Sequence, residues 1–171
     1  APTAWEEIKR VATQHRCQSL LLGLGQVSHG TSNQELQELI EKAGCDVALM
    51  NSPPHWQLHN VRRVLVPVGG RGTEHELRAR FLGSLTRNGD REVTFLSVVP
   101  TSTVESQAKK TQQTIERLAE VKLGGNVLVE VLKSDSPVKT ILEESANYDL
   151  IVLGLGQMVN SDLLDNPAIR I

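Results

Sequence analysis

Short apolar runs alternate along the chain with longer segments in which apolar residues recur every three to four positions. The runs predict buried strands and the periodic segments predict amphipathic helices. Strands are expected at 19–25, 45–50, 62–68, 92–100, 126–133 and 149–156. Helices are expected at 5–15, 34–44, 73–88, 103–123 and 136–148, with a short helix and a turn in the tail 161–171. This alternation predicts an α/β fold, with a parallel sheet between two layers of helices.

The four letters GLGQ occur twice, at 23–26 and at 154–157, each time directly after an apolar run. A repeat at this distance indicates that one structural unit is written twice. We therefore expect residues 1–50 to be the C-terminal part of a first unit and 51–61 to be a linker. Residues 62–171 would form a second unit that lacks its own fifth strand.

Composition and charge narrow the class of protein. Apolar residues make up 39% of the chain and charged residues 22%, as in soluble globular proteins. The net charge is −2 and no stretch is rich in lysine or arginine, so no nucleic-acid partner is expected. No apolar run approaches the roughly 20 residues of a membrane span, and no signal peptide is visible. Because the chain starts at Ala1 without a methionine, we expect a cytoplasmic fragment of a longer polypeptide.

Residues that could carry catalysis or hold a metal form no motif. Cys17 and Cys45 adjoin predicted buried strands and are interpreted as small core residues in a reducing compartment. No histidine stands beside a serine or cysteine in a nucleophile motif, and no set of four metal ligands can be named. The histidines are His15, His29, His55, His59 and His75. We expect no enzyme activity, no catalytic residue and no metal.

Glycine-bearing turns follow three of the predicted strands. Ligands of open parallel sheets bind beyond the carboxyl ends of the strands, and glycine lets backbone N–H groups approach a phosphate closely. The candidate positions are Gly23, Gly25, Gly30 and Thr31 in the first unit and Gly69, Gly70, Gly154 and Gly156 in the second. Neither a Walker A sequence nor a G-x-G-x-x-G fingerprint is present, so a tight turn out of a buried strand is the alternative.

Several motifs in order resemble the universal stress protein family. They are VLVPV at 64–68, FLSVVP at 95–100, SPVKTILE at 136–143 followed by YDLIVLG at 148–154, and CDVALM at 45–50. The resemblance implies a three-layer, Rossmann-like fold of the adenine-nucleotide α-hydrolase type, with five parallel strands and frequent tandem repeats. It also implies that ATP or AMP is a possible ligand, with Val98 at the backbone position that meets adenine.

The sequence departs from the family pattern where the nucleotide is held. Nucleotide-binding members of the family carry an aspartate directly after the first strand, in V-D-x-S, whereas this chain has Gly69 there. Gln26 and Gln157 stand where the family's phosphate motif has its second glycine. The nucleotide site is therefore expected to be eroded.

Two functions remain open after this comparison. The first is a non-catalytic regulatory domain, similar to the cytoplasmic tails of transporters such as cation-chloride cotransporters, amino-acid permeases and chloride channels. It would dock against the membrane part of the same polypeptide or another protein. The alternative is a soluble universal stress protein that binds ATP or AMP. In either case we expect a homodimer, because the strand at 45–50 would complete the second unit within the chain or in a partner chain.

Overall fold

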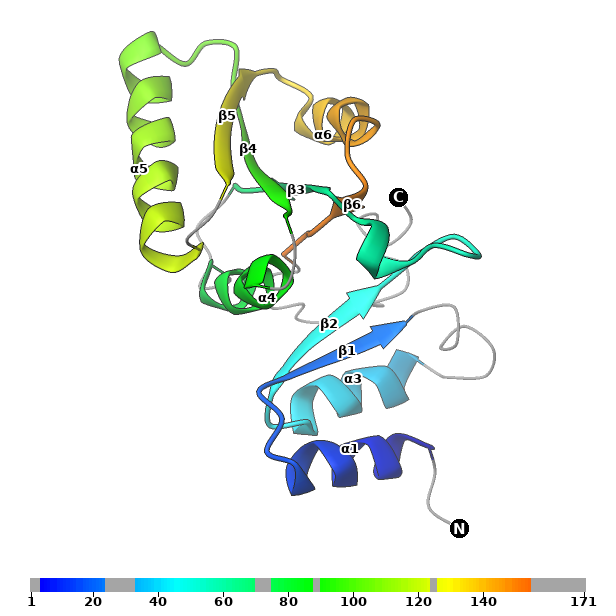
Figure 1. Cartoon of the computed structure of the whole chain (residues 1–171). Helices are drawn as coiled ribbons and strands as arrows, with labels where there is room; N and C mark the ends of the chain where they lie inside the picture. Colours follow the sequence, from blue (N-terminus) through cyan, green and yellow to red (C-terminus); the bar gives the residue numbers. More distant parts are fainter. Residues whose placement is uncertain (1–3, 24–32, 70–74, 88–89, 124–125, 155–171) are drawn as a thin grey trace. The chain divides into compact units, whose positions relative to one another are not determined.

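The computed structural model describes residues 4–23, 33–69, 75–87, 90–123 and 126–154 (Figure 1). The chain divides into two compact units, and the boundary lies between Trp56 and Gln57. Each unit builds a parallel sheet, so the predicted α/β class is confirmed. The tail at 161–171 lies outside the described residues.

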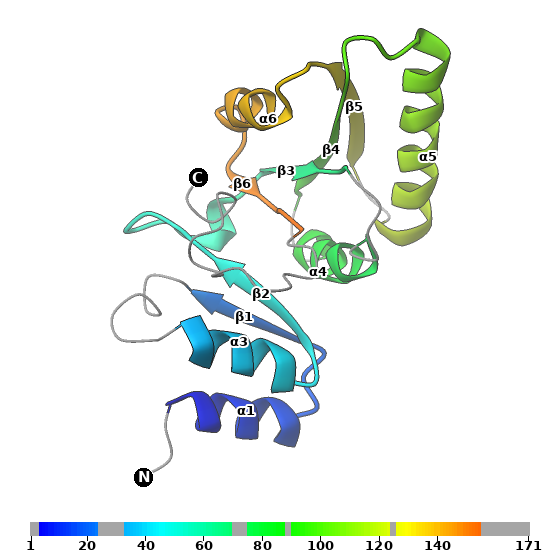
Figure 2. The same cartoon turned by 180° about the vertical axis from the view of Figure 1, so that it is seen from behind.

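Unit 1 consists of two successive helix–strand pairs. They are α1 (Ala4–Gln14), β1 (Ser19–Gly23), α3 (Asn33–Lys42) and β2 (Asp46–Met50). The two strands pair in parallel, and both helices lie on the same side of them (Figures 1 and 2). The described residues of this unit contain one β–α–β crossover, from β1 through α3 to β2, and α1 packs beside α3 on the same face.

The core of unit 1 lies between its helices and one face of its two strands. Leu22 and Leu39 are buried there, and Trp5, Ile8 and Leu20 pack against them. These residues have the spacing from which the helices and the strand were predicted.

The opposite face of β1 is open, however, because Leu21 is 43% exposed. The prediction that this strand is buried on both faces is wrong. The described residues of unit 1 supply helices to one side only.

Unit 2 contains a four-stranded sheet with the order β5-β4-β3-β6, in which all strands are parallel. The strands are β3 (Arg63–Pro67), β4 (Glu92–Val99), β5 (Val127–Lys133) and β6 (Leu150–Ile151). Val64, Leu65 and Val66 in β3 are fully buried, as expected for a central strand covered on both faces. The last strand is shorter than the predicted 149–156, since ladder pairing is confined to two residues.

Helices cover both faces of this sheet. The chain passes through η1 (Leu58–Asn60), α4 (His75–Arg87), α5 (Glu105–Leu123) and α6 (Pro137–Ser145). The steps from β3 to β4 and from β4 to β5 run in one direction, so right-handed crossovers put α4 and α5 on one face. The return from β5 to β6 runs the other way and puts α6 on the opposite face (Figures 1 and 2). The result is the helix–sheet–helix layering of a Rossmann-like half.

The third helix of unit 2 is shorter than the predicted segment 136–148. It ends at Ser145, and the next residues form a turn. In that turn Asn147 N–H donates to the Glu144 carbonyl at 3.0 Å, and Tyr148 N–H donates to the Ser145 carbonyl at 3.1 Å. This tight turn leads the chain directly into β6.

Candidate functional site

The strand order of unit 2 creates a topological switch point between β3 and β6. From β3 the chain moves outward to β4 and β5, and it then returns past them to β6. The connection that leaves β3 leads to α4 on one face of the sheet, whereas the connection that enters β6 comes from α6 on the other face. In open parallel sheets, ligands bind outside the carboxyl ends of the strands at such a point.

Two predicted glycines lie at this switch point. Gly69 follows Val68, whose N–H still bonds to a carbonyl of β4 at 2.8 Å. Gly154 comes two residues after Val152, whose N–H bonds to a carbonyl of β3 at 2.9 Å. Both glycines are exposed. The structure thus brings together, at the ends of adjacent strands, two positions that are 85 residues apart in the sequence.

Val98 lies at the same edge of the sheet, one strand further on. It is the next-to-last residue of β4 and pairs with Leu132 of β5. The loops that follow these two strands are tied together by Thr101 and Asp135. The N–H of Thr101 donates to one carboxylate oxygen at 3.0 Å and its hydroxyl donates to the other at 2.5 Å. This pair of bonds fixes the loops that border the candidate site.

The backbone of this edge does not itself require glycine. A Cβ atom added at Gly69 would meet no atom within 4 Å, and the same is true at Gly23 in unit 1. Neither residue has a positive φ, unlike Gly44 with a φ of 66°. Neither packing nor backbone conformation therefore requires a glycine at Gly69. The space above its backbone is open, and a phosphate group could approach the backbone N–H groups closely there.

The opposite, amino edge of the sheet carries a carboxylate with a structural role. Asp149 accepts hydrogen bonds from the N–H of Arg63 at 2.8 Å and of Arg62 at 2.9 Å. These backbone bonds, Arg63 first, lower the pKa of Asp149 below its usual value. Because Asp149 directly precedes β6, the bonds align this short strand with β3.

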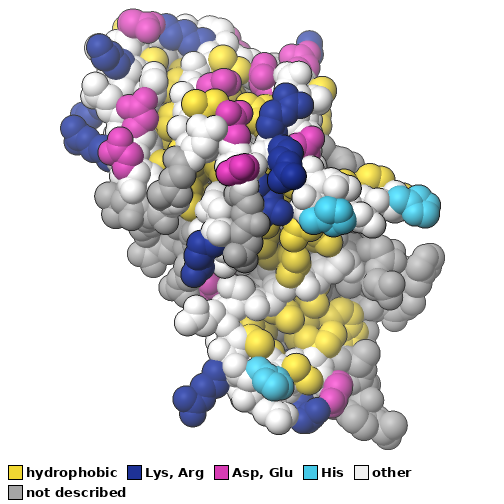
Figure 3. All heavy atoms as spheres, in the orientation of Figure 1, with side chains coloured by type: hydrophobic (Ala, Val, Ile, Leu, Met, Phe, Trp, Pro, Cys, Tyr) yellow, Lys and Arg dark blue, Asp and Glu magenta, His cyan; other side chains and the backbone are white. Residues whose placement is uncertain are grey.

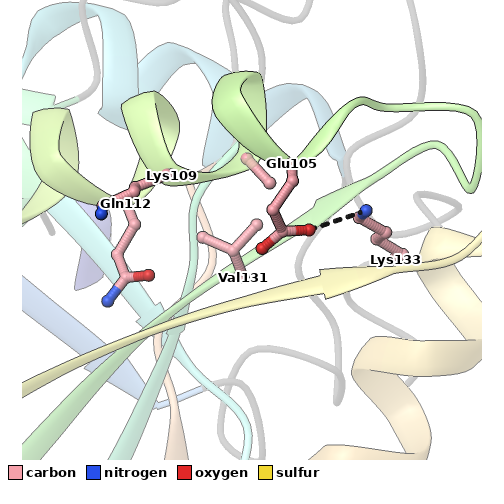
Figure 4. Close-up of a pocket in the computed structure, with 6 residues that line it drawn as sticks. Glu105, Lys109, Gln112, Val131 and Lys133 are labelled. Carbon is pink, nitrogen blue, oxygen red and sulfur yellow. Dashed lines mark hydrogen bonds and ion pairs between the residues drawn. The ribbon is translucent and has the colours of Figure 1, made fainter.

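A polar hollow of about 420 Å³ lies between α5 and β5 (Figure 4). Inside it the Lys133 ammonium lies 3.1 Å from the Glu105 carboxylate, and the Glu105 side chain is 88% exposed. An ion pair this exposed contributes at most about 1 kcal/mol. The hollow is lined by Glu105, Ala108, Lys109, Gln112, Val131 and Lys133. Ligand sites are mostly apolar and enclose their ligand, so this hollow is a weaker candidate than the switch point.

The remaining predicted site residues do not join this edge in the described structure. Gly23 is the last residue of β1 and belongs to the other unit. Gly25, Gly30, Thr31, Gly70 and Gly156 lie outside the described residues, as do Gln26 and Gln157. The first glycine of each GLGQ copy does have a comparable place, directly at or shortly after the end of a parallel strand.

The Thr101–Asp135 pair was not predicted from the sequence, and the two cysteines are less buried than predicted. Asp135 comes from a loop 34 residues away from Thr101, and no local pattern connects the two. Cys17 and Cys45 were predicted to be core residues, but both are only half-buried. They lie just before the amino ends of β1 and β2.

Charge and metal-ligating groups form no concentrated site in the parts of the chain that can be described. Figure 3 shows acidic and basic side chains interspersed over unit 2 on the face in view. Within the described ranges no group of three or more histidine, cysteine, aspartate or glutamate residues could hold a metal ion. No described helix has both the length and the apolar character needed to cross a bilayer.

Comparison with known proteins adds distant structural likeness only. No family model and no curated protein matches the chain. Among solved structures, protein Rv1636 from Mycobacterium tuberculosis H37Rv aligns with 61% of this chain and 77% of its own, at 15% identity and a TM-score of 0.43. A likeness this distant says nothing about ligands or activity, and the fold assignment stands on the strand order and ladders of the chain itself.

Proposed function

We propose that this chain is a non-catalytic regulatory and interaction domain of the universal-stress-protein type, in the cytoplasmic part of a larger membrane transporter. The observation that carries the proposal is the open face of the sheet in unit 1. Leu21 is 43% exposed on that face, and its ladder partner Ala48 is only half-buried. The described helices of unit 1 cover only the other face of this sheet, so the face with Leu21 is the one that we propose lies against another protein surface.

The partner surface that we propose is a second copy of the chain. Parallel sheets in α/β proteins are covered on both faces, and Leu21, Ala48 and Met50 form a short apolar strip on the uncovered side. A two-fold axis would bring two such strips together. Burial of apolar area at roughly 25 cal/mol per Å² would then favour association.

Light scattering over a range of protein concentrations tests the dimer. We expect the wild-type chain to dimerise and Leu21→Glu to shift it toward monomer, because two carboxylates would meet in an apolar contact. Val11→Glu is the matched control, since Val11 is 40% exposed but lies on helix α1. A wild-type chain that stays monomeric at high concentration, or equal effects of the two variants, would refute this surface as the dimer contact.

The transporter assignment has its own test. We expect the gene to encode an apolar membrane region in the same polypeptide. In the full-length protein, Leu21→Glu should change transport while Val11→Glu does not. An open reading frame that starts near Ala1 would remove the link to a membrane protein within the same polypeptide.

A second function, binding of ATP or AMP by a soluble universal stress protein, is favoured by the convergence of Gly69, Gly154 and Val98 on the switch point. Thermal-shift titration with ATP, ADP and AMP tests it. A ligand that binds only the folded state stabilises it by RT ln(1 + [L]/Kd), about 2.7 kcal/mol at a hundredfold excess over Kd. The eroded site of the first proposal predicts no shift at millimolar ligand.

If a nucleotide raises the melting temperature, variants at Gly69 and Gly154 test whether it binds at this edge of the sheet. Gly69→Val should abolish binding while the fold persists, because the added side chain enters open space. Gly154→Val should do the same from the neighbouring strand. Gly83→Ala, inside helix α4 and equally free of clashes, is the control that should leave binding unchanged. Normal binding by both valine variants would show that the nucleotide binds at another place in the protein.

A further inference from the structure

The connection from α1 to β1 ends the helix with a tight hydrogen-bonded turn. The helix ends at Gln14, and Arg16 adopts a left-handed conformation with a φ of 48°. The N–H of Arg16 donates to the Thr13 carbonyl at 3.1 Å, and the N–H of Cys17 donates to the Ala12 carbonyl at 2.9 Å. These are the two bonds of a Schellman motif. They place Cys17 directly after the left-handed residue.

The connection from α3 to β2 has the same plan. Helix α3 ends at Lys42, and Gly44 is left-handed with a φ of 66°. Cys45 follows it directly, as Cys17 follows Arg16. The two cysteines therefore occupy equivalent places in two neighbouring helix-to-strand connections on the same side of the sheet.

The strand ladder brings these two places close together. Asp46 N–H donates to the Gln18 carbonyl at 3.1 Å, and Ser19 pairs with Asp46. Continued by one residue, this register sets Cys45 opposite Gln18, which adjoins Cys17. Neighbouring strands lie about 4.8 Å apart, and the cysteines are within one or two residues of the paired Ser19 and Asp46. The chain bends at Gln18 and at Cys45, so the alternation of side chains between the two faces of a regular strand does not extend to the cysteines. Disulfides form at Cα separations of roughly 4.4–6.8 Å.

The two thiols are within reach of solvent and close enough to influence each other. Both thiols are free and half-buried. Burial raises the pKa of the Cys45 thiol, and the charges of Cys17 and Asp46 raise it further.

We propose that Cys17 and Cys45 form a reversible disulfide that ties the ends of α1 and α3 together, with a low-molecular-weight disulfide such as oxidised glutathione as the oxidant. The bond would lie at the amino edge of β1 and β2, where it would link the two strands that the structure describes in unit 1. Oxidation would then stiffen the unit whose open face we propose as an interaction surface. The thiol chemistry itself does not depend on that function.

The reaction consists of two thiol–disulfide exchanges. The Cys17 thiolate attacks one sulfur of oxidised glutathione, forms a mixed disulfide and releases one glutathione thiolate, which takes up a proton. The Cys45 thiolate then attacks the Cys17 sulfur, forms the internal disulfide and releases the second glutathione. Two protein thiols are oxidised and one glutathione disulfide is reduced to two thiols.

The experiment equilibrates the whole chain in buffers with different ratios of reduced to oxidised glutathione, followed by alkylation and intact-mass measurement. We expect wild type to lose both alkylation sites together and to lose the mass of two hydrogens, with full recovery after dithiothreitol. Cys17→Ser and Cys45→Ser should each carry one glutathione instead.

A parallel equilibration in urea separates native proximity from simple chain flexibility. The native structure should hold the disulfide at a ratio on the order of tenfold more reducing than the unfolded chain does. Circular dichroism of the serine variants verifies that they fold. Wild type that keeps both thiols, takes up two glutathiones, links to a second chain, or shows the same midpoint in urea would overturn the proposal.

Discussion

Thr101 binds both carboxylate oxygens of Asp135, through its backbone N–H at 3.0 Å and through its hydroxyl at 2.5 Å. The bonds join the loop after β4 to the loop after β5, beside the edge where Gly69 and Gly154 converge. The hydroxyl bond, followed by the backbone bond, lowers the pKa of Asp135 below its usual value. The exposed Asp135 carboxylate therefore holds in place the two loops that border the candidate site.

Removal of the Thr101 hydroxyl should loosen these loops. Thr101→Val keeps the side-chain shape and the backbone N–H but loses the shorter of the two bonds. We expect faster amide hydrogen exchange in the loops after β4 and β5, and a small decrease in melting temperature. Thr101→Ser, which retains a hydroxyl, should behave like wild type. Equal exchange in both variants would show that the bond does not hold the loops.

Asp149 should make the stability of unit 2 dependent on acid. Its folded pKa lies below the unfolded value of about 3.9, because the N–H groups of Arg63 and Arg62 bond to the charged form. The stabilisation is therefore complete above the unfolded pKa and is lost as the pH falls through the folded pKa.

Urea unfolding at several pH values measures this dependence. Asp149→Asn should cost about 1 kcal/mol, discounted for solvent exposure, and the cost should be constant between about pH 5 and pH 7. Below about pH 4 the difference from wild type should shrink toward zero. Asp90→Asn, at an exposed position, removes the same charge and should leave the profile nearly unchanged. A cost that persists in acid would argue against ionisation as its cause.

Arg91 should contribute strongly to the stability of unit 2. Its guanidinium donates to the carbonyls of Leu58 at 3.0 Å, Val61 at 3.1 Å and Leu85. These bonds join η1, the residue that follows it and the last turn of α4. Arg91→Met should destabilise unit 2 by about 2 kcal/mol, because buried carbonyls lose a charged donor. Arg87→Met is the control, since Arg87 is exposed and should change stability by less than about 0.5 kcal/mol. Chemical denaturation decides between them.

Thr94 should be a position where a substitution stabilises. Its side chain is fully buried, and its hydroxyl has no hydrogen-bond partner among the described residues. Thr94→Val removes that unsatisfied group at constant shape and should stabilise unit 2 by about 1 kcal/mol. In Thr86→Val the lost hydroxyl donates to the Leu82 carbonyl at 2.9 Å, so no gain is expected. Destabilisation by Thr94→Val would reveal a partner for the hydroxyl.

Two glycines should respond in opposite directions to alanine. Gly83 lies inside α4 with no atom within 4 Å of an added Cβ, so Gly83→Ala should stabilise by about 0.5–1 kcal/mol through helix propensity and unfolded-state entropy. Gly44 has the same free space but a φ of 66°, so Gly44→Ala should destabilise by about 1 kcal/mol. Thermal unfolding of the two variants checks the pair, and shifts of the same sign would contradict the backbone assignment.

Local pattern determined the kind and order of elements in this protein. Apolar runs such as Val64–Val66 became buried strands, and segments with three-to-four spacing became helices, because both signals depend on neighbours along the chain. The alternation of the two, together with the right-handed rule for crossovers, was enough to predict the parallel α/β fold. The same reasoning placed Gly69 and Gly154 after strands, where ligands of such folds bind.

Tertiary structure alone decided which distant residues meet. The sequence does not show that Arg91 donates hydrogen bonds to three carbonyls or that Thr101 binds Asp135. Nor does it show that Cys17 and Cys45 lie at equivalent positions in two neighbouring helix-to-strand connections. Nor does it show that β1 has an open face, since Leu21 belongs to the same apolar run as the buried Leu22. These contacts depend on register and crossover direction, which many residues set together, whereas hydrophobic periodicity records only whether a position tends to be buried.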